Sequence, residues 1–275
     1  MSGKEKFTLN GKNVIVTGAS GGLGKAMTFR LIAAYGCRVL GVSRSADKLL
    51  AVKEQLGEKG DCFQFLALDV SARGSWQELA DYVRTGGFDA DVLINNAGML
   101  PGFAKFGRYS ADEIDRCMAL NLDAVLWAAE AFIPLLEKKP GAALINIASA
   151  DALCALAGTS LYSASKAAVK ALSEAMREEY RGRIYIPAVC PGFIRTDIMS
   201  HQKNAVSPLI GKVSMPVEKA ARVLLRRANA GRSRIVFGFD AHFMSAAYRI
   251  APVLSLRFFR WFFRVSGVEV FKDIF

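Results

Sequence analysis

The stretch NVIVTGASGGLG, residues 13–24, constrains the fold of this chain more than any other part of it. It joins a β-branched run at residues 14–16 to a helical pattern over residues 25–35 through a turn with four glycines. Such a turn lets backbone N–H groups approach a phosphate, with the positive end of the next helix behind them. The spacing is G-x-x-x-G-x-G and not G-x-G-x-x-G. The stretch alone therefore predicts a strand–turn–helix unit that either binds a phosphate or only makes a tight connection.

Short apolar runs alternate with helical patterns along the rest of the chain. Strands are predicted over residues 14–16, 38–42, 62–68, 91–94, 143–147, 184–189 and 234–237. Helices are predicted over residues 25–35, 46–56, 75–84, 111–136, 161–180 and 218–230. Continuous apolar strands that alternate with helices indicate parallel strands buried on both faces. We therefore predict an α/β fold: a single doubly wound Rossmann-type parallel sheet of about seven strands, with helices on both faces.

In such a sheet, ligands bind beyond the carboxyl ends of the strands. We expect residues 1–239 to form this domain and residues 240–275 to form a C-terminal amphipathic tail. A chain of 275 residues that is 52% hydrophobic can bury a full core of this kind.

The N-terminal residues and the cysteines indicate the compartment. Residues 1–12 contain no apolar stretch, and the longest run without Asp, Glu, Lys or Arg, residues 152–165, is too short for a bilayer span. The five cysteines are scattered, with no C-x-x-C pair, so we expect no metal site. These features predict a cytoplasmic protein in a reducing compartment, with a peripheral membrane location as the alternative.

The net charge of +11 is uneven, because residues 222–275 carry ten Lys or Arg against three acids. A basic excess indicates an anionic partner, such as a phosphorylated cofactor, a lipid surface or nucleic acid, or simply a solvated face. No nucleic-acid motif occurs, and the aromatic residues cluster in the tail instead of interleaving with a broad basic surface. We therefore expect no nucleic-acid partner.

The end of the second predicted strand indicates the cofactor. An acid about 20 residues after the glycine turn would bind the ribose 2′-hydroxyl of NAD. Here Ser43 and Arg44 stand at the strand end, with no carboxylate. Because these two residues suit a 2′-phosphate, we favour NADP(H) over NAD(H). Alternatively, Arg44 is simply exposed, or it stacks on adenine.

Four polar residues are candidates for catalysis. Tyr162 and Lys166 are four residues apart on one face of a predicted helix. An ammonium beside a phenol should lower the phenol pKa, which suits a general acid or base for a carbonyl/alcohol pair. Ser149 ends the fifth predicted strand, and Asn121 lies mid-helix, where asparagine is a poor helix former and could mark a local distortion. Taken singly, each also fits a solvated helix face, a turn or a buried amide.

Together, these residues and three further segments resemble the short-chain dehydrogenase/reductase family in its standard-length, NADP-preferring form. Thr17-Gly18-x-x-x-Gly22-x-Gly24 is similar to its cofactor-binding glycine motif, and Asn95-Asn96-Ala97-Gly98 to its NNAG segment. Asn121, Ser149, Tyr162 and Lys166 follow the order and spacing of its catalytic tetrad. Pro191-Gly192-Phe193-Ile194-Arg195-Thr196 is similar to its PGxxxT segment, and Asp69-Val70 to the pair that holds adenine. The resemblance covers about residues 12–238.

The resemblance implies roles for these residues. Tyr162 is expected to be the acid/base, Lys166 to lower its pKa and hold the nicotinamide ribose, Ser149 to polarise the substrate carbonyl, and Asn121 to hold a water of a proton relay. The basic residue that some NADP-preferring members carry inside the glycine turn is absent, since Ser20 and Gly21 stand there. A homodimer or homotetramer is also implied. The implied cofactor site comprises Gly18, Ser20, Gly22, Leu23, Gly24, Ser43, Arg44, Asp69, Val70, Asn96, Ala97, Gly98, Tyr162, Lys166, Pro191, Gly192, Ile194 and Thr196.

In this family, variable segments shape the substrate site, and here they are residues 100–106, 150–156 and 193–215. They offer few charges, which indicates a lipophilic carbonyl or alcohol such as a steroid, retinoid, fatty aldehyde or ketoacyl group. We expect Ser149, Leu156, Tyr162 and Phe193 to contact it. Further apolar candidates are Met99, Leu100, Phe103, Leu153, Ile198 and Met199, some of which could instead pack in the core.

The tail combines aromatic and basic residues. Arg249, Arg257, Arg260 and Arg264 fall within about 80° on a helix, and aromatic residues cover most of the remaining circumference. This pattern suits an anionic membrane surface or packing on the domain or a second subunit, and Pro252 is expected to start or kink the helix. The complete tetrad favours an NADP(H)-dependent oxidoreductase. The alternative is a non-catalytic NADP(H)-binding sensor or scaffold of the same fold, docked on a membrane or a partner through the tail.

Overall fold

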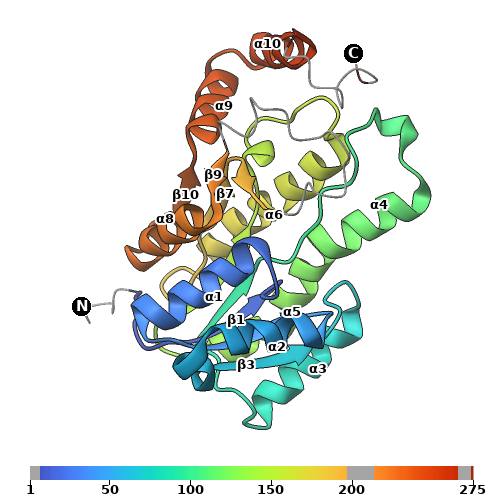
Figure 1. Cartoon of the computed structure of the whole chain (residues 1–275). Helices are drawn as coiled ribbons and strands as arrows, with labels where there is room; N and C mark the ends of the chain where they lie inside the picture. Colours follow the sequence, from blue (N-terminus) through green and yellow to red (C-terminus); the bar gives the residue numbers. More distant parts are fainter. Residues whose placement is uncertain (1–6, 197–213, 266–273, 275) are drawn as a thin grey trace.

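The computed structural model describes residues 7–196, 214–265 and 274, and it has one large parallel sheet between two layers of helices (Figure 1). The strand order is β10-β7-β5-β4-β1-β2-β3, with β6 paired to β5. The strands are β1 Asn13–Thr17, β2 Arg38–Ser43, β3 Phe63–Ala67, β4 Val92–Asn95, β5 Ala142–Ile147, β6 Ile184–Tyr185, β7 Ala188–Pro191 and β10 Arg234–Phe237. A separate two-stranded sheet pairs β8 Ile194–Arg195 with β9 Met215–Pro216. The predicted α/β class and the doubly wound parallel sheet are confirmed.

The helices follow the strands as the sequence predicted, with short 3₁₀ turns between them. The 3₁₀ turns are η1 Gly57–Cys62, η2 Phe106–Arg108 and η4 Ala150–Ala152. The α-helices are α1 Gly22–Tyr35, α2 Ala46–Gln55, α3 Arg73–Arg84, α4 Ala111–Met118, α5 Ala124–Leu136, α6 Ser160–Glu179, α8 Val217–Asn229, α9 Phe239–Ile250 and α10 Pro252–Val265.

Alternate strand residues enter two different cores, one on each face of the sheet. Val14 and Val16 of β1 pack against α1, α2 and α8, whereas Ile15 packs against α3 and α5. Leu31 of α1 and Phe132 of α5 are fully buried on these opposite faces. This alternation is the reason why the strands read as continuous apolar runs.

Two predicted elements are interrupted. The helix predicted over residues 111–136 divides into α4 and α5 around a π-helical segment, η3 Ala119–Asp123. The strand predicted over residues 184–189 divides into β6 and β7, because Pro187 between them has no N–H for the ladder.

By length and mean hydropathy (1.5), the stretch 111–136 is the one described helical segment that could cross a membrane. In the fold, however, Ala128 and Phe132 of α5 are fully buried in the core. Core helices pass the same hydropathy test, so this segment is weak evidence for a span.

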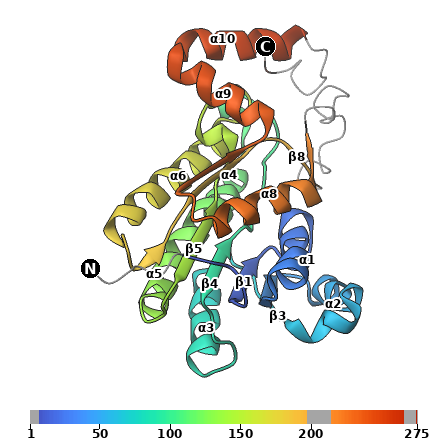
Figure 2. The ribbon, with the colours of Figure 1, turned by 90° about the vertical axis from the view of Figure 1, so that its left-hand side faces the viewer.

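The tail forms two helices at the end of the molecule opposite to α3 (Figures 1 and 2). Pro252 begins α10, as predicted. Ala241 and Met244 of α9 are buried, as are Phe259 and Phe263 of α10, and they join one hydrophobic cluster with the loop after β5. The tail therefore packs on the domain along one side.

Candidate functional site

A cavity of about 630 Å³ lies at the carboxyl ends of the central strands, and we call it the central cavity. It is bounded by the glycine turn, the ends of β2, β4, β5 and β7, one face of α6, and the tail. The lining residues predicted from the sequence are Gly18, Ser20, Gly22, Leu23, Arg44, Asn96, Ala97, Gly98, Leu100, Phe103, Ser149, Leu156, Tyr162, Lys166, Pro191, Gly192, Phe193, Ile194 and Thr196.

Backbone approach at two positions of the glycine turn explains why glycine stands there. Gly18 has φ +68°, and a Cβ on it would lie 3.0 Å from Asn96 Nδ2. A Cβ on Gly24 would lie 2.1 Å from the Gly18 carbonyl oxygen, which no side chain tolerates. Helix α1 therefore starts directly above the turn, and no side chain caps its first N–H groups. Gly21, Gly22 and Leu23 at this helix start line the central cavity, so the turn fits the phosphates of a dinucleotide.

Thr17 and Asn96 tie the glycine turn to the end of β4. Thr17 Oγ1 accepts hydrogen bonds from the N–H groups of Asn96 (2.9 Å) and Ala97 (3.0 Å). Asn96 Nδ2 donates to the Thr17 carbonyl at 2.9 Å. The segment 96–98 is thereby fixed as one wall of the central cavity.

Two basic residues stand where a 2′-phosphate is expected. Arg44 follows β2, and Lys48 lies four residues later on α2; both line the central cavity. Ser20 Oγ of the glycine turn and Ser43 Oγ at the end of β2 share a hydrogen bond of 2.7 Å. Lys48 is missing from the sequence prediction, although its R-x-x-x-K spacing from Arg44 could have identified it.

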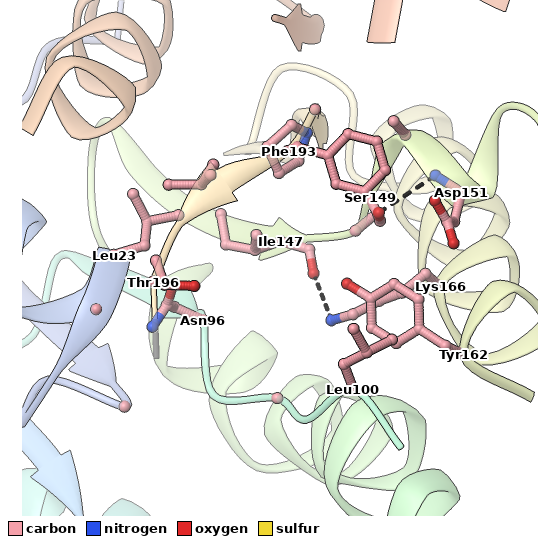
Figure 3. Close-up of a pocket in the computed structure, with 18 of the residues that line it drawn as sticks. Leu23, Asn96, Leu100, Ile147, Ser149, Asp151, Tyr162, Lys166, Phe193 and Thr196 are labelled. Atoms are coloured by element: carbon pink, nitrogen blue, oxygen red, sulfur yellow. Dashed lines mark hydrogen bonds between the residues drawn. The ribbon is translucent and has the colours of Figure 1, made fainter. Parts of the chain in front are cut away.

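The tetrad residues come from three segments: Asn121 from the π-helical segment, Ser149 from just after the end of β5, and Tyr162 and Lys166 from α6. In Figure 3, the side chains of Ser149, Tyr162 and Lys166 converge on the same part of the cavity. Lys166 Nζ donates to the Ile147 carbonyl at 2.9 Å and lies 6.0 Å from the centroid of the Tyr162 ring. Ser149 Oγ accepts from Asp151 N–H at 3.2 Å.

Asn121 lies behind these residues in the π-helical segment, at the helix distortion that its sequence position indicated. Its side chain is fully buried. Its Oδ1 accepts from Met99 N–H at 2.8 Å, and its Nδ2 donates to the Met99 carbonyl at 2.9 Å and to Ser165 Oγ at 3.1 Å. A Cβ on Gly98 would lie 3.1 Å from Asn121 Oδ1 and 3.3 Å from Lys166 Nζ. Asn121 therefore holds the loop after β4 next to Lys166.

The expected direction of the Tyr162 pKa shift is wrong in this structure. Removal from water raises the pKa of Tyr162, the Asp151 carboxylate raises it further, and a hydrogen bond with Ser149 opposes the rise. Lys166 is not among the groups that shift it. Burial instead lowers the pKa of Lys166 to about 8. The physical reason is that the effect of burial on the phenol is larger than the effect of the nearby Lys166 ammonium. That ammonium donates its hydrogen bond to the Ile147 carbonyl and not to Tyr162.

Asp151 is a buried carboxylate in the cavity wall that sequence reasoning missed. Its Oδ2 accepts hydrogen bonds from Thr159 Oγ1 (2.9 Å) and Ser163 Oγ (3.4 Å). Burial raises the pKa of Asp151 to about 6 in spite of these bonds. Asp151 is the one charged residue that segment 150–156 places in the cavity lining.

Asp151→Asn tests this ionisation. Because the folded-state pKa is raised, the folded state binds the proton more tightly, and stability falls as pH rises through about 6. Asparagine removes that loss and still accepts from Thr159. We expect the variant to match wild type near pH 4 and to exceed it by about 2–3 kcal/mol above pH 7. Urea unfolding across this range measures it, with exposed Asp61→Asn as the control; a stability difference that does not change with pH would contradict it.

Asp240, at the start of α9, is the second carboxylate that the sequence analysis missed. Its Oδ2 accepts from Phe193 N–H at 2.6 Å, while its buried Oδ1 has no hydrogen-bond partner among the described residues. A Cβ on Gly192 or Gly238 would lie 2.2 Å or 2.5 Å from Oδ1. Burial raises the pKa of Asp240. The first turn of the tail thus holds Gly192 and Phe193, which follow β7 and line the cavity, through the Asp240 carboxylate.

Several predicted site residues lie elsewhere. Gly24, Ser43, Asp69, Val70 and Asn121 do not line the central cavity. Asp69 Oδ1 accepts from the N–H and the hydroxyl of Ser71, and the Val70 carbonyl accepts from Trp76 Nε1.

Of the apolar substrate candidates, Met99 and Leu153 pack in hydrophobic clusters. Ile198 and Met199 lie outside the described residues. Phe263 of α10 lines the cavity instead. The aromatic pattern of the tail does not indicate which of its rings reaches the cavity.

Comparisons with known proteins agree with this arrangement. The sequence profile of the short chain dehydrogenase family matches residues 12–206. The chain is 32% identical over 193 residues to 3beta-hydroxysteroid dehydrogenase 2 of Eggerthella lenta, covering 69% of this chain and 74% of that protein. It is 31% identical over 261 residues to ketoacyl reductase HetN of Nostoc sp., covering 93% and 90%. A short-chain dehydrogenase from Sphingobium yanoikuyae in complex with NADPH has a similar structure (TM-score 0.75, 25% identity, 89% of this chain and 95% of that one).

Proposed function

This chain belongs to the short-chain dehydrogenase/reductase family and is an oxidoreductase, and from that premise we propose that it interconverts a lipophilic carbonyl and alcohol with NADP(H). The observation that carries the proposal is the convergence of Ser149, Tyr162 and Lys166 on one cavity that also contains the glycine turn (Figure 3).

The residues of the central cavity fit a nicotinamide dinucleotide. The glycine turn and the start of α1 would receive its phosphates, the segment 96–98 and Lys166 the nicotinamide ribose, and Pro191–Thr196 the nicotinamide. Fit rests on Gly18, Gly21 and Gly22, which line the cavity at the start of α1 and have no side chains that would keep a phosphate away from the backbone. When bound, the cofactor supplies or accepts the hydride.

The protein's own residues handle the proton. In reduction, Tyr162 would donate its phenolic proton to the carbonyl oxygen as that oxygen gains charge, and Ser149 would hold the same oxygen by a hydrogen bond. In oxidation, the phenolate would take the proton back. Asn121 and Lys166 flank Gly98, and we propose that Asn121 holds a water that resupplies the proton.

The raised pKa of Tyr162 favours the protonated phenol at neutral pH. This is the form that donates a proton to a carbonyl oxygen in reduction. Four apolar side chains support a lipophilic substrate: Leu100, Phe103, Leu156 and Phe193 line the same cavity. The names of the two relatives, a hydroxysteroid dehydrogenase and a ketoacyl reductase, support the same substrate class.

Arg44 and Lys48 support NADP(H) over NAD(H). Charge-assisted hydrogen bonds to a phosphate are worth about 1.5–3 kcal/mol each. We therefore expect Arg44→Asp to weaken NADPH binding by about a hundredfold and NADH binding by less than threefold, because only NADPH carries the 2′-phosphate. Fluorescence titration with both cofactors measures this, and Lys48→Asp should show a smaller bias. Equal weakening of both would mean that Arg44 does not contact the phosphate.

We propose a cytoplasmic homodimer or homotetramer, as the family suggests, with an anionic membrane surface as a partner of the tail. Ten exposed hydrophobic side chains between residues 239 and 265 support a tail partner of some kind. No nucleic-acid partner is proposed.

Oxidation of NADPH and NADH, followed by absorbance against a panel of lipophilic ketones and aldehydes, tests the proposed function. We expect turnover with NADPH and at least one bulky apolar carbonyl, and little with short polar ones. Tight NADPH binding without turnover of any panel member would favour the sensor or scaffold alternative.

A further inference from the structure

The exposed apolar surface of the described residues is concentrated in the tail. Ten of the thirteen exposed large hydrophobic side chains lie within residues 239–265. They are Phe239, Phe243, Tyr248, Ile250, Val253, Leu254, Leu256, Phe258, Trp261 and Val265. Single exposed hydrophobic residues are ordinary, but a concentration of this kind marks an interaction surface.

The aromatic side chains of α9 and α10 form one continuous group. The ring centroids of Phe239 and Phe243 lie 6.2 Å apart, those of Phe243 and Phe258 6.3 Å, and those of Phe258 and Trp261 6.0 Å. The group therefore crosses from one helix to the other. We call this the α9–α10 surface; it comprises these four rings with Leu254 and Val265.

Helix α10 has three faces with different roles. Ser255, Phe259 and Phe263 recur every four residues and are buried. Leu254, Phe258, Trp261 and Val265 recur at spacings of four, three and four residues and are exposed. Arg257, Arg260 and Arg264 form the third face and are also exposed. An apolar stripe beside an arginine stripe is the arrangement of a helix that lies in a membrane interface.

Charge favours an anionic lipid surface over a second copy of the chain. Helix α10 contains no acidic residue, and the one acid of α9, Asp240, is turned into the central cavity. Among the described residues, Arg249, Arg257 and Arg264 take part in no ion pair. A like surface on a second copy would bring arginines against arginines, whereas anionic headgroups offer the opposite charge.

The inner face of the same helix closes the catalytic site. Phe263 lines the central cavity, and Asp240 at the start of α9 accepts a hydrogen bond from Phe193 of the cavity wall at 2.6 Å. The helices that would contact a bilayer thus contribute Asp240 and Phe263 to the wall of the central cavity.

We propose that α9 and α10 form a membrane-docking lid: the α9–α10 surface binds an anionic bilayer, and the lipophilic substrate passes from that bilayer into the central cavity alongside α10. The route of the substrate rests on the proposed function, whereas the docking does not. Docking would also free the substrate from crossing water, which is the main barrier for a lipophilic molecule.

Vesicle co-sedimentation tests docking without any assay of activity. We expect the full chain to sediment with phosphatidylcholine vesicles containing 30% phosphatidylglycerol and much less with phosphatidylcholine alone. Arg257→Glu/Arg264→Glu should lower partitioning at least about tenfold, as should Leu254→Glu/Trp261→Glu. The controls are Arg222→Glu for charge and Leu50→Glu for an exposed apolar residue on α2. Equal sedimentation of all variants, or no sedimentation with anionic vesicles, would overturn the proposal.

Two further measurements separate the remaining outcomes. Light scattering should give the same mass for wild type and Leu254→Glu/Trp261→Glu; a smaller mass for the variant would identify the surface as a contact between copies and overturn the proposal. For the substrate route, the double variant should keep wild-type kcat/KM with a water-soluble ketone and lose at least about fivefold with a vesicle-embedded ketone. Sedimentation without this difference would retain docking and overturn the route, and absence of turnover with either ketone would count against the proposed function alone.

Discussion

Tyr162→Phe is expected to lower kcat for carbonyl reduction by about a thousandfold or more, within the range that general acid catalysis contributes. The substitution removes the phenolic hydroxyl of Tyr162, which lines the central cavity together with Ser149 and Lys166, and it keeps the aromatic ring. NADPH binding should change little, because we place the phosphate contacts in the glycine turn and at Arg44. Stopped-flow or steady-state absorbance gives kcat, and fluorescence titration gives the cofactor affinity.

Tyr185→Phe is the matched control for this substitution. This substitution also removes a phenolic hydroxyl, which in Tyr185 donates a hydrogen bond to the Arg232 carbonyl at 2.7 Å. Tyr185 does not line the central cavity. We expect wild-type turnover from it. A Tyr162→Phe variant that turns over as fast as the Tyr185→Phe variant would remove Tyr162 from the mechanism.

Gly24→Ala is expected to have the second largest effect, on stability and on cofactor binding together. The new Cβ would lie 2.1 Å from the Gly18 carbonyl oxygen and 2.7 Å from Asn96 Nδ2. Helix α1 must therefore move away from β1, which misplaces the N–H groups at its start. Overpacking of this kind costs about 1–3 kcal/mol, and we expect NADPH affinity to fall by at least tenfold.

Gly74→Ala is the matched control for Gly24→Ala. Gly74 lies in α3 with nothing within 4 Å of its added Cβ, so alanine should leave stability unchanged or raise it slightly. Thermal unfolding and NADPH titration of both variants measure the contrast. Wild-type cofactor affinity in Gly24→Ala would mean that the close approach of α1 to β1 is not needed for binding.

The sequence identifies the elements of this fold well where the signal is local. The glycine turn, the apolar strands and the Y-x-x-x-K pair on α6 depend on neighbours in the chain, and all have their predicted places except the strand over residues 184–189, which Pro187 divides. The π-helical segment at Asn121 was only partly visible, because asparagine indicates a distortion but not its type.

Features that depend on distant residues could not be predicted. Asp240 accepts a hydrogen bond from the N–H of Phe193, which is 47 positions away in the sequence. Phe263 reaches the cavity only because the tail folds back on the domain. The direction of the Tyr162 pKa shift depends on burial and on Asp151, and neither is visible in the spacing of Tyr162 and Lys166. Local patterns therefore located the candidate site, while the pKa shifts within it depend on the three-dimensional structure.

The most direct test of the account is to follow the hydride itself. The enzyme is incubated with NADPH that carries deuterium at both positions of nicotinamide C4 and with the carbonyl of the panel that it reduces fastest. The mass of the alcohol product is then measured by mass spectrometry. We predict that wild type gives an alcohol heavier by one mass unit and that Tyr162→Phe gives almost none. An alcohol without deuterium, or NADPH that binds but transfers no deuterium to any carbonyl of the panel, would contradict hydride transfer in the central cavity.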